Sequence, residues 1–201
     1  MEFLVTMTTR VPDGVTEAEV AEVRAREAAH SAVLAGQGHL KRLWRPPPAP
    51  GQWRTLGLFA ADDAAALEVV LASMPLRIWR TDEVTELSAH PNDPGPDRIA
   101  LDPGAGEFFT TFVVAVPSDA TAADVDAMTA REARRTRELA AAGQLIRLWR
   151  LPGDGRNLGH WQTAEAELLR KIVDGLPMAP WLSVDTLPLT RHPSDPGTVA
   201  R

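Results

Sequence analysis

The sequence contains no cysteine. This excludes disulfide bonds, a thiolate nucleophile and any zinc site built on cysteine, and it suits a reducing cytoplasm. Long apolar runs are also lacking, since none approaches the roughly 18 residues of a membrane helix. The first residues lack the basic-then-apolar order of a signal peptide. We therefore expect a soluble, cytoplasmic protein without a membrane partner.

An excess of positive charge is lacking as well. The chain has 21 Lys and Arg against 27 Asp and Glu, a net charge of −6 and a pI near 5.4. Nucleic-acid binding calls for a basic face, so that class of partner is not expected. The sequence has no HExxH pattern, phosphate-binding glycine loop or G-x-S-x-G turn, and its five histidines form no cluster. We expect no metal site.

The sequence does contain a long internal repeat. Residues 2–95 reappear as residues 107–197 with almost no gaps. The pairing starts at an offset of 105 residues, at which the R-L-W-R segment of residues 42–45 falls on that of residues 147–150. After a loop that is three residues shorter in the second copy, the offset becomes 102. Comparing the copies shows which residues each half retains.

The period of the repeat is that of a small domain, since solenoid units are roughly 20–50 residues long. We therefore predict one domain at residues 1–95 and a second at residues 107–201, joined by a linker at about residues 96–106 that is rich in Pro, Gly and Asp. About a hundred residues bury only a thin core, so the two copies are expected to pack on each other as a pseudo-dimer.

Each repeat shows the same order of predicted elements. In the first copy, Thr16 and Glu19 form a capping box that begins a helix running to about residues 36–38. The remaining pattern predicts strands at residues 3–11, 40–45, 53–59 and 81–87 and a second helix at residues 62–73. The order βαββαβ predicts an α+β fold of two ferredoxin-like repeats, each with four strands and two helices.

A glutamate interrupts the apolar stripe of the first helix. The stripe contains Val20, Val23, Glu27 and Leu34, and Glu132 takes the place of Glu27 in the second copy. An inward carboxylate is costly, and burial raises its pKa towards the range that a general acid or base needs. The alternatives are a structural ion pair with Arg42 or Arg147, or a side chain that bends out to solvent. These interpretations remain open at this point.

The R-L-W-R strand offers an arginine and a tryptophan on one face. Because side chains alternate along a strand, Arg42 lies beside Trp44, and Arg147 beside Trp149. Next to a cavity, such a pair could bind a carboxylate and cover an apolar ring. The alternative is a core tryptophan with arginines at the sheet edge.

Each repeat resembles muconolactone Δ-isomerase over almost its whole length. The resemblance rests on the opening strand (residues 1–8), the R-A-R-E helix segment (residues 24–27), G-x-x-x-x-L-W-R (residues 38–45), the M-P-L and L-P-M-A-P segments, and the closing R-H-P (residues 191–193). It implies ferredoxin-like units that pair into an α+β barrel, here within one chain. It also implies a cofactor-free proton shift within an unsaturated lactone during aromatic-ring catabolism, and leaves open a homo-oligomer.

The resemblance assigns roles to several residues. Glu27 or Glu132 would be the catalytic base, and Arg42 or Arg147 would hold a carboxylate or oxyanion. The remaining substrate-binding candidates are Arg24, Trp44, Trp149 and Asn157. The copies depart from the family differently: its lysine is Arg24 in one and Thr129 in the other, and its H-x-x-N-x-S set is reduced to Gln52, Thr55 and Gly57 or to Asp154, Asn157 and Gly159.

The sequence thus predicts a cofactor-independent isomerase acting on a small unsaturated lactone or related acid. Two alternatives remain: a cofactor-free cyclase or monooxygenase of the same barrel fold acting on a polyketide or aromatic natural product, and a non-catalytic small-molecule binding module. We expect the two copies to differ in activity, with the first favoured because Arg24 keeps a cation beside its glutamate.

Overall fold

The computed structural model describes residues 1–48 and 53–198, so that Gln52 lies outside the described residues. The chain forms two compact units. Unit 1 consists of Met1–Leu87 together with the segment from Thr190 onwards, and unit 2 is Ser88–Leu189. The segment that follows the last strand of each sequence repeat therefore belongs to the other repeat's unit.

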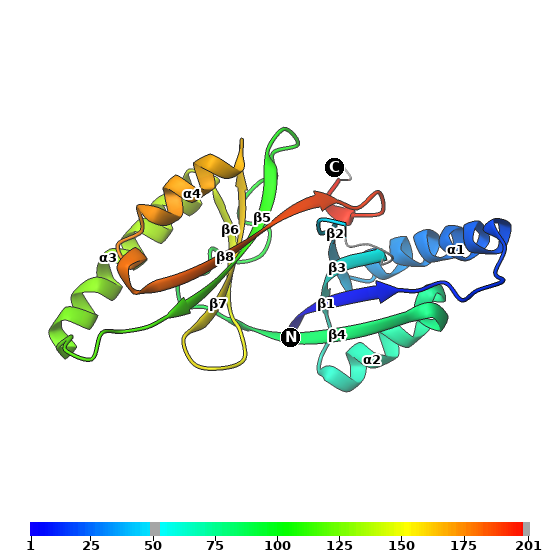
Figure 1. Ribbon diagram of the computed structural model, residues 1–201, viewed down its shortest axis with the longest axis horizontal. Helices are drawn as coiled ribbons and strands as arrows, with labels where there is room; N and C mark the ends of the chain where they lie inside the picture. The colour runs from blue at the N-terminus through cyan, green and yellow to red at the C-terminus, as the bar shows by residue number, and fades with distance from the viewer. Residues whose placement is uncertain (49–52, 199–201) are drawn as a thin grey trace. The chain divides into compact units, whose positions relative to one another are not determined.

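Unit 1 has the predicted βαββαβ order (Figure 1). Its elements are β1 (Glu2–Thr9), α1 (Glu17–Gly36), β2 (Leu40–Arg45), β3 (Trp53–Ala60), α2 (Ala64–Ser73), the 3₁₀ helix η1 (Pro75–Trp79) and β4 (Arg80–Ala89). The capping box at the start of α1 is present, because the Thr16 hydroxyl accepts the Glu19 N–H and Glu19 accepts the Thr16 N–H. The predicted start of this helix is therefore confirmed.

Unit 2 repeats the order. It contains β5 (Gly106–Val114), α3 (Ala122–Ala141), β6 (Leu145–Arg150), β7 (Arg156–Thr163), α4 (Ala166–Asp174), η2 (Ala179–Trp181) and β8 (Leu182–Arg191), and η3 (Pro196–Thr198) follows in unit 1. Figure 1 shows α3 and α4 on one side of strands β5 to β8. The second unit thus has the fold of the first.

The strands pair antiparallel in each unit. In unit 1, β1 lies between β3 and β4, and β2 pairs with β3. In unit 2, β5 lies between β7 and β8, and β6 pairs with β7. The last residues of β8 pair with β2, and the last residues of β4 pair with β6. The resulting order β1-β3-β2-β8-β5-β7-β6-β4 is cyclic, which is the strand order of an α+β barrel.

The core of each unit lies between its sheet and its two helices. Alternate residues of β1 are buried. Three of them, Phe3, Val5 and Met7, belong to one hydrophobic cluster with Leu34 of α1 and Leu71 of α2. Unit 2 has the equivalent cluster around β5, α3 and α4. The period of two in the strands therefore places one face of each sheet against the helices, and both cavities described below open on that face.

Candidate functional site

Unit 1 contains a cavity of ≈ 300 Å³ between α1, η1, the helix-facing side of the sheet and the segment after β8. Its charged or titratable lining comes from α1 (Arg24 and Glu27), β2 (Arg45), β4 (Arg80) and the segment after β8 (His192). The rest of the lining consists of apolar side chains and of residues that carry hydroxyl groups. The cavity therefore combines one carboxylate, three guanidinium groups and an imidazole with apolar and hydroxyl-bearing walls.

Glu27 lies in this cavity with its carboxylate held from two sides. Its Oε2 accepts the backbone N–H of Leu76 at 2.8 Å, and its Oε1 lies 3.2 Å from Nη1 of Arg80. Its side chain is 13% exposed. Burial raises the pKa of Glu27 above its ordinary value, although the Leu76 N–H and the Arg80 charge act to lower that pKa. The carboxyl group is thus poised closer to neutrality than an exposed glutamate.

The cation that faces Glu27 is Arg80, where the sequence had suggested Arg42. The guanidinium of Arg80 also donates to Asp82, at 2.6 Å from Nε to Oδ1 and 2.9 Å from Nη2 to Oδ2. Its side chain is 1% exposed. Arg80 escaped notice in the sequence because the second copy has Leu182 in its place. Comparison of the copies favours residues that both retain.

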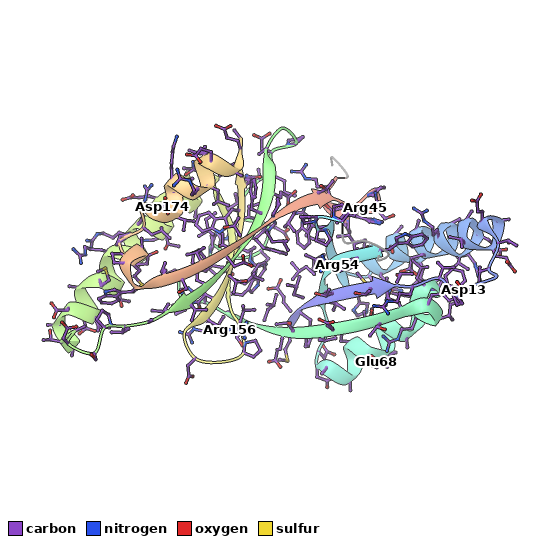
Figure 2. The ribbon with its side chains drawn as sticks, viewed as in Figure 1. Asp13, Arg45, Arg54, Glu68, Arg156 and Asp174 are labelled. Carbon is purple, nitrogen blue, oxygen red and sulfur yellow. The ribbon has the colours of Figure 1, made fainter. Side chains whose placement is uncertain are left out.

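Arg24 and Arg45 are the exposed cations of the same cavity. The guanidinium of Arg24 lies 5.4 Å from the centre of the Trp53 ring, a cation–π contact. Arg45 lies at the end of β2, where Figure 2 labels it. Within residues 1–48 and 53–198, no carboxylate forms an ion pair with Arg24 or Arg45. Both cations are therefore available to an anionic ligand.

His192 contributes a neutral imidazole to the lining. Its Nδ1 lies 3.1 Å from the backbone N of Ser194. A backbone N–H is a donor, so Nδ1 is assigned as the acceptor and Nε2 carries the proton of the neutral ring. Burial, followed by the Arg45 charge, lowers the pKa of His192 to about 4. At neutral pH the ring is an uncharged hydrogen-bond donor.

Unit 2 has an equivalent but much smaller cavity of ≈ 60 Å³, lined in part by His90, Glu132 and Asn157. Oε2 of Glu132 accepts the backbone N–H of Met178 at 2.9 Å, as Glu27 accepts that of Leu76. Burial raises the pKa of Glu132 as well. The counterparts of Arg80 and Arg24 are Leu182 and Thr129, so the strong cation beside the carboxylate is lost.

Two larger aromatic side chains line the second cavity. Phe112 stands where unit 1 has Met7, and Trp161 where it has Phe59. The two rings meet edge to face with their centres 6.4 Å apart. The indole Nε1 donates to Thr110 Oγ1 at 2.7 Å, which fixes the tryptophan. The added ring volume accounts for the smaller cavity.

Arg42 and Trp44, predicted to bind substrate, are absent from the residues that line the cavity of unit 1. The Arg42 guanidinium lies 4.8 Å from the centre of the Trp44 ring and binds the carboxylate of Asp195 through Nε and Nη2. Strand alternation explains the difference: Leu43 and Arg45 face the cavity, so their neighbours Arg42 and Trp44 project from the opposite face.

The second copy has the same arrangement. Arg147 lies 4.7 Å from the centre of the Trp149 ring and binds Asp93 at 3.2 Å from Nε. Neither Arg147 nor Trp149 lines the cavity of unit 2, whereas Asn157 does. Of the sequence-derived candidates, the structure thus brings Arg24 together with Glu27, and Asn157 together with Glu132.

Two further properties concern the described part of the chain. Among residues 1–48 and 53–198, no group of three or more His, Asp or Glu side chains could hold a metal ion. The helices within those residues also include none with the length and apolar character to cross a membrane.

Comparisons with known proteins find relatives of both sequence repeats. The family model for muconolactone delta-isomerase matches residues 1–93 and again residues 107–195. Muconolactone Delta-isomerase of Rhodococcus opacus is 31% identical over 88 residues, which is 44% of this chain and 95% of the relative. Muconolactone Delta-isomerase 1 of Acinetobacter lwoffii is 32% identical over 92 residues, 46% of this chain and 93% of the relative. Each relative therefore corresponds to one repeat.

Solved structures resemble the whole chain in fold alone. A haem-binding protein from Thermus thermophilus has a TM-score of 0.61 at 12% identity, covering 96% of this chain and 93% of its own. A point mutant of chlorite dismutase from Candidatus Nitrospira defluvii has a TM-score of 0.62 at 11% identity, covering 96% and 92%. Because the family model matches both repeats, the chain belongs to the muconolactone delta-isomerase family, as a tandem duplication.

Proposed function

We propose that the cavity of unit 1 moves a proton between two carbons of a small unsaturated lactone, without a cofactor. The observation that carries this proposal is Glu27, a carboxyl group of raised pKa in a cavity that also offers cations and a neutral imidazole. A proton shift along an unsaturated ester is redox-neutral, so one base that takes a proton and then donates one is sufficient.

The reaction begins with Glu27 as the base. One carboxylate oxygen takes a proton from the ring carbon γ to the lactone carbonyl, and the electron pair of that C–H bond moves into the conjugated system. The negative charge collects on the carbonyl oxygen as a dienolate. Glu27, now protonated, exchanges its proton with solvent in part of the turnovers and then delivers a proton to the carbon next to the carbonyl, and the double bond shifts. The Leu76 N–H and Arg80 keep the carboxylate in one orientation during both transfers.

The dienolate oxygen needs a donor, and His192 can supply it. The neutral ring presents Nε2–H, and a pKa of about 4 prevents it from competing with Glu27 for the proton at neutral pH. A hydrogen bond that strengthens as charge develops on oxygen lowers the barrier, commonly by several kcal/mol for one well-placed donor.

The substrate is proposed to carry a carboxylate in addition to the lactone. Arg24 and Arg45 line the cavity, and no described carboxylate pairs with either. Guanidinium groups bind carboxylates through paired N–H donors. A volume of ≈ 300 Å³ lies at the lower end of ligand pockets, which suits a compact acid.

A purely structural role for Glu27 is the main competing interpretation. The ion pair with Arg80 supports it, but the second repeat retains Glu132 although Leu182 replaces the arginine. Both glutamates share the bond to a backbone N–H, which a glutamine oxygen could also accept. A Glu→Gln change therefore preserves that bond and removes the base.

The test follows deuterium from solvent into muconolactone by NMR. The parent chain is expected to exchange and isomerise the substrate, Glu27→Gln to lose both activities, and Glu132→Gln to retain them. Loss of activity only in Glu132→Gln would transfer the reaction to unit 2. No exchange by the parent chain with muconolactone or related unsaturated lactone acids would refute the proposed reaction.

A further inference from the structure

The segment that follows β8 is fixed to unit 1 by a buried ion pair. Asp195 is 1% exposed, and its carboxylate accepts Nε of Arg42 at 3.0 Å and Nη2 at 2.9 Å. Its Oδ1 also accepts the backbone N–H of Leu43 at 2.9 Å. The carboxylate is thus satisfied by a forked guanidinium and a backbone donor, the geometry that makes a buried pair specific.

The surroundings leave little room for the guanidinium to move. The Arg42 group lies 4.8 Å from the centre of the Trp44 ring. A Cβ added at Gly197 would lie 2.5 Å from Nε of Arg42, which is closer than real contacts allow. Gly197 is therefore required for the close approach of backbone and guanidinium. The segment after β8 therefore both supplies Asp195 and covers the Arg42 guanidinium with its backbone at Gly197.

A short series of backbone bonds connects this ion pair to the cavity. The Asp195 N–H donates to the His192 carbonyl at 2.8 Å, and the His192 N–H donates to the Leu43 carbonyl at 3.1 Å. The Ser194 N–H binds Nδ1 of the same histidine at 3.1 Å. Both polar backbone groups of Leu43 therefore bind the segment, one at Asp195 and one at His192.

We propose that Asp195 is a positioning residue for the cavity of unit 1: through Arg42 and Leu43 it holds His192 so that the imidazole lines the cavity as an Nε2–H donor. The contribution to turnover rests on the proposed function, whereas the positioning of the ring does not. By this inference, the second sequence repeat supplies a donor to the site whose base belongs to the first.

Unit 2 contains a matched arrangement that serves as an internal control. Asp93 accepts Arg147 Nε at 3.2 Å and the Leu148 N–H at 2.8 Å. The Asn92 N–H binds His90 Nδ1 at 3.1 Å, and His90 lines the smaller cavity. The same substitution can therefore be made in either unit, with the same chemical change and a different histidine affected.

The test is a pH titration of the imidazole nitrogens by NMR on the full chain, with Asp195→Asn beside Asp93→Asn. Two effects on His192 have opposite signs. The negative charge of Asp195 raises the pKa of His192, so removing that charge around an unmoved ring would lower the pKa further. Release of the ring into water would instead raise the pKa towards the ordinary value of roughly 6.5.

We expect Asp195→Asn to raise the pKa of His192 by at least about one unit and to mix its two tautomers, because an exposed ring loses its fixed bond to Ser194. His90 should titrate as in the parent chain. Asp93→Asn should show the reciprocal pattern. Isomerisation by Asp195→Asn should fall by about 10²-fold in kcat with a smaller change in KM, as for a misplaced catalytic group. Asp93→Asn should retain the parent rate.

Asp195→Asn removes the carboxylate charge beside the buried guanidinium of Arg42, which threatens folding. Arg42→Lys, matched by Arg147→Lys, keeps a cation beside the carboxylate but loses the forked geometry, and the same shift of His192 is expected in weaker form. The proposal is overturned if His192 keeps its tautomer and its pKa stays at or below about 4 in folded Asp195→Asn or Arg42→Lys. A parent chain that fails to exchange deuterium would refute the proposed function alone, since the titration needs no substrate.

Discussion

Replacing Glu27 by glutamine separates its chemical role from its structural one. The amide has the size and shape of the carboxylate, but it cannot take a proton from carbon. If Glu27 is the base, the rate should fall by roughly 10² to 10⁴, the usual contribution of a general base. Substrate binding should change little, because Arg24 and Arg45 are untouched.

The cost in stability follows from the two contacts of the carboxylate. One glutamine oxygen can accept the Leu76 N–H, as Oε2 does at 2.8 Å. The NH₂ group of the glutamine then takes the place of Oε1, which lies 3.2 Å from Nη1 of Arg80 in the parent chain. Two hydrogen-bond donors therefore face each other. An unsatisfied contact of this kind costs about 1–3 kcal/mol. Relief of the carboxylate's desolvation offsets part of it, and Arg80 retains Asp82, so we expect a net loss below about 2 kcal/mol.

Glu132→Gln provides the matched comparison. Its carboxylate accepts the Met178 N–H, and Leu182 stands where unit 1 has Arg80. The amide therefore meets no opposing guanidinium at that position, and the change in unfolding free energy should stay within about 0.5 kcal/mol. Turnover should match the parent chain, because the cavity of unit 2 is only ≈ 60 Å³.

The pH dependence of stability adds a second measurement. The pKa of Glu27 is raised in the folded state, so this residue favours folding most at low pH, and its contribution is lost as pH rises through the folded pKa. Glu27→Gln should remove that slope. Thermal melts between about pH 4 and 8, together with deuterium exchange into muconolactone, test both effects. Variants that melt far lower and still exchange deuterium at the parent rate would refute catalysis by Glu27.

Three further predictions concern the cavities. Arg24→Gln combined with Arg45→Gln should raise KM at least about tenfold with a smaller change in kcat, because each cation is proposed to bind the substrate carboxylate; an unchanged KM would remove this assignment. Phe112→Met combined with Trp161→Phe should enlarge the cavity of unit 2 and add a second binding event for muconolactone in calorimetry, whereas an unchanged stoichiometry in a folded variant would contradict the occlusion. The lowered pKa of His192 means that its contribution to stability is present above about pH 6.5 and is lost as pH falls towards about 4. His192→Asn should flatten this acid limb of the stability profile, and an unaltered limb would count against the burial of the ring.

Much of the fold could be predicted from the sequence because its signals are local. Thr16 and Glu19 mark a helix start through bonds made within one turn, and strand alternation shows which residues share a face. The segments that follow β4 and β8 could not be assigned to a unit in this way. Both segments have the sequence H-P-x-D-P-G. Because the two are alike, the sequence does not show whether each segment packs on its own repeat or on the other one.

The candidate site was predicted in part for related reasons. Glu27 was visible because a charge in an apolar helix stripe requires an explanation. Arg42 and Trp44 were correctly placed on one face of a strand, but alternation does not reveal which face meets the helices. The cation beside Glu27 was missed because Arg80 occurs in one copy only. His192 was not among the predicted site residues, since only tertiary structure brings it to the cavity.

The exchange of the segments after β4 and β8 has a consequence for evolution. A mutation in the DNA that encodes residues 192–198 is inherited with the second repeat but selected for its effect on the cavity of the first. The two halves of the duplicated gene are therefore not free to diverge separately, even though one cavity has nearly closed. A gene fission between the repeats would leave each product without the segment that completes its unit, because that segment is encoded in the other half. Comparisons of the ancestral sites should accordingly join residues 1–87 to residues 190–198, across the boundary of the duplication.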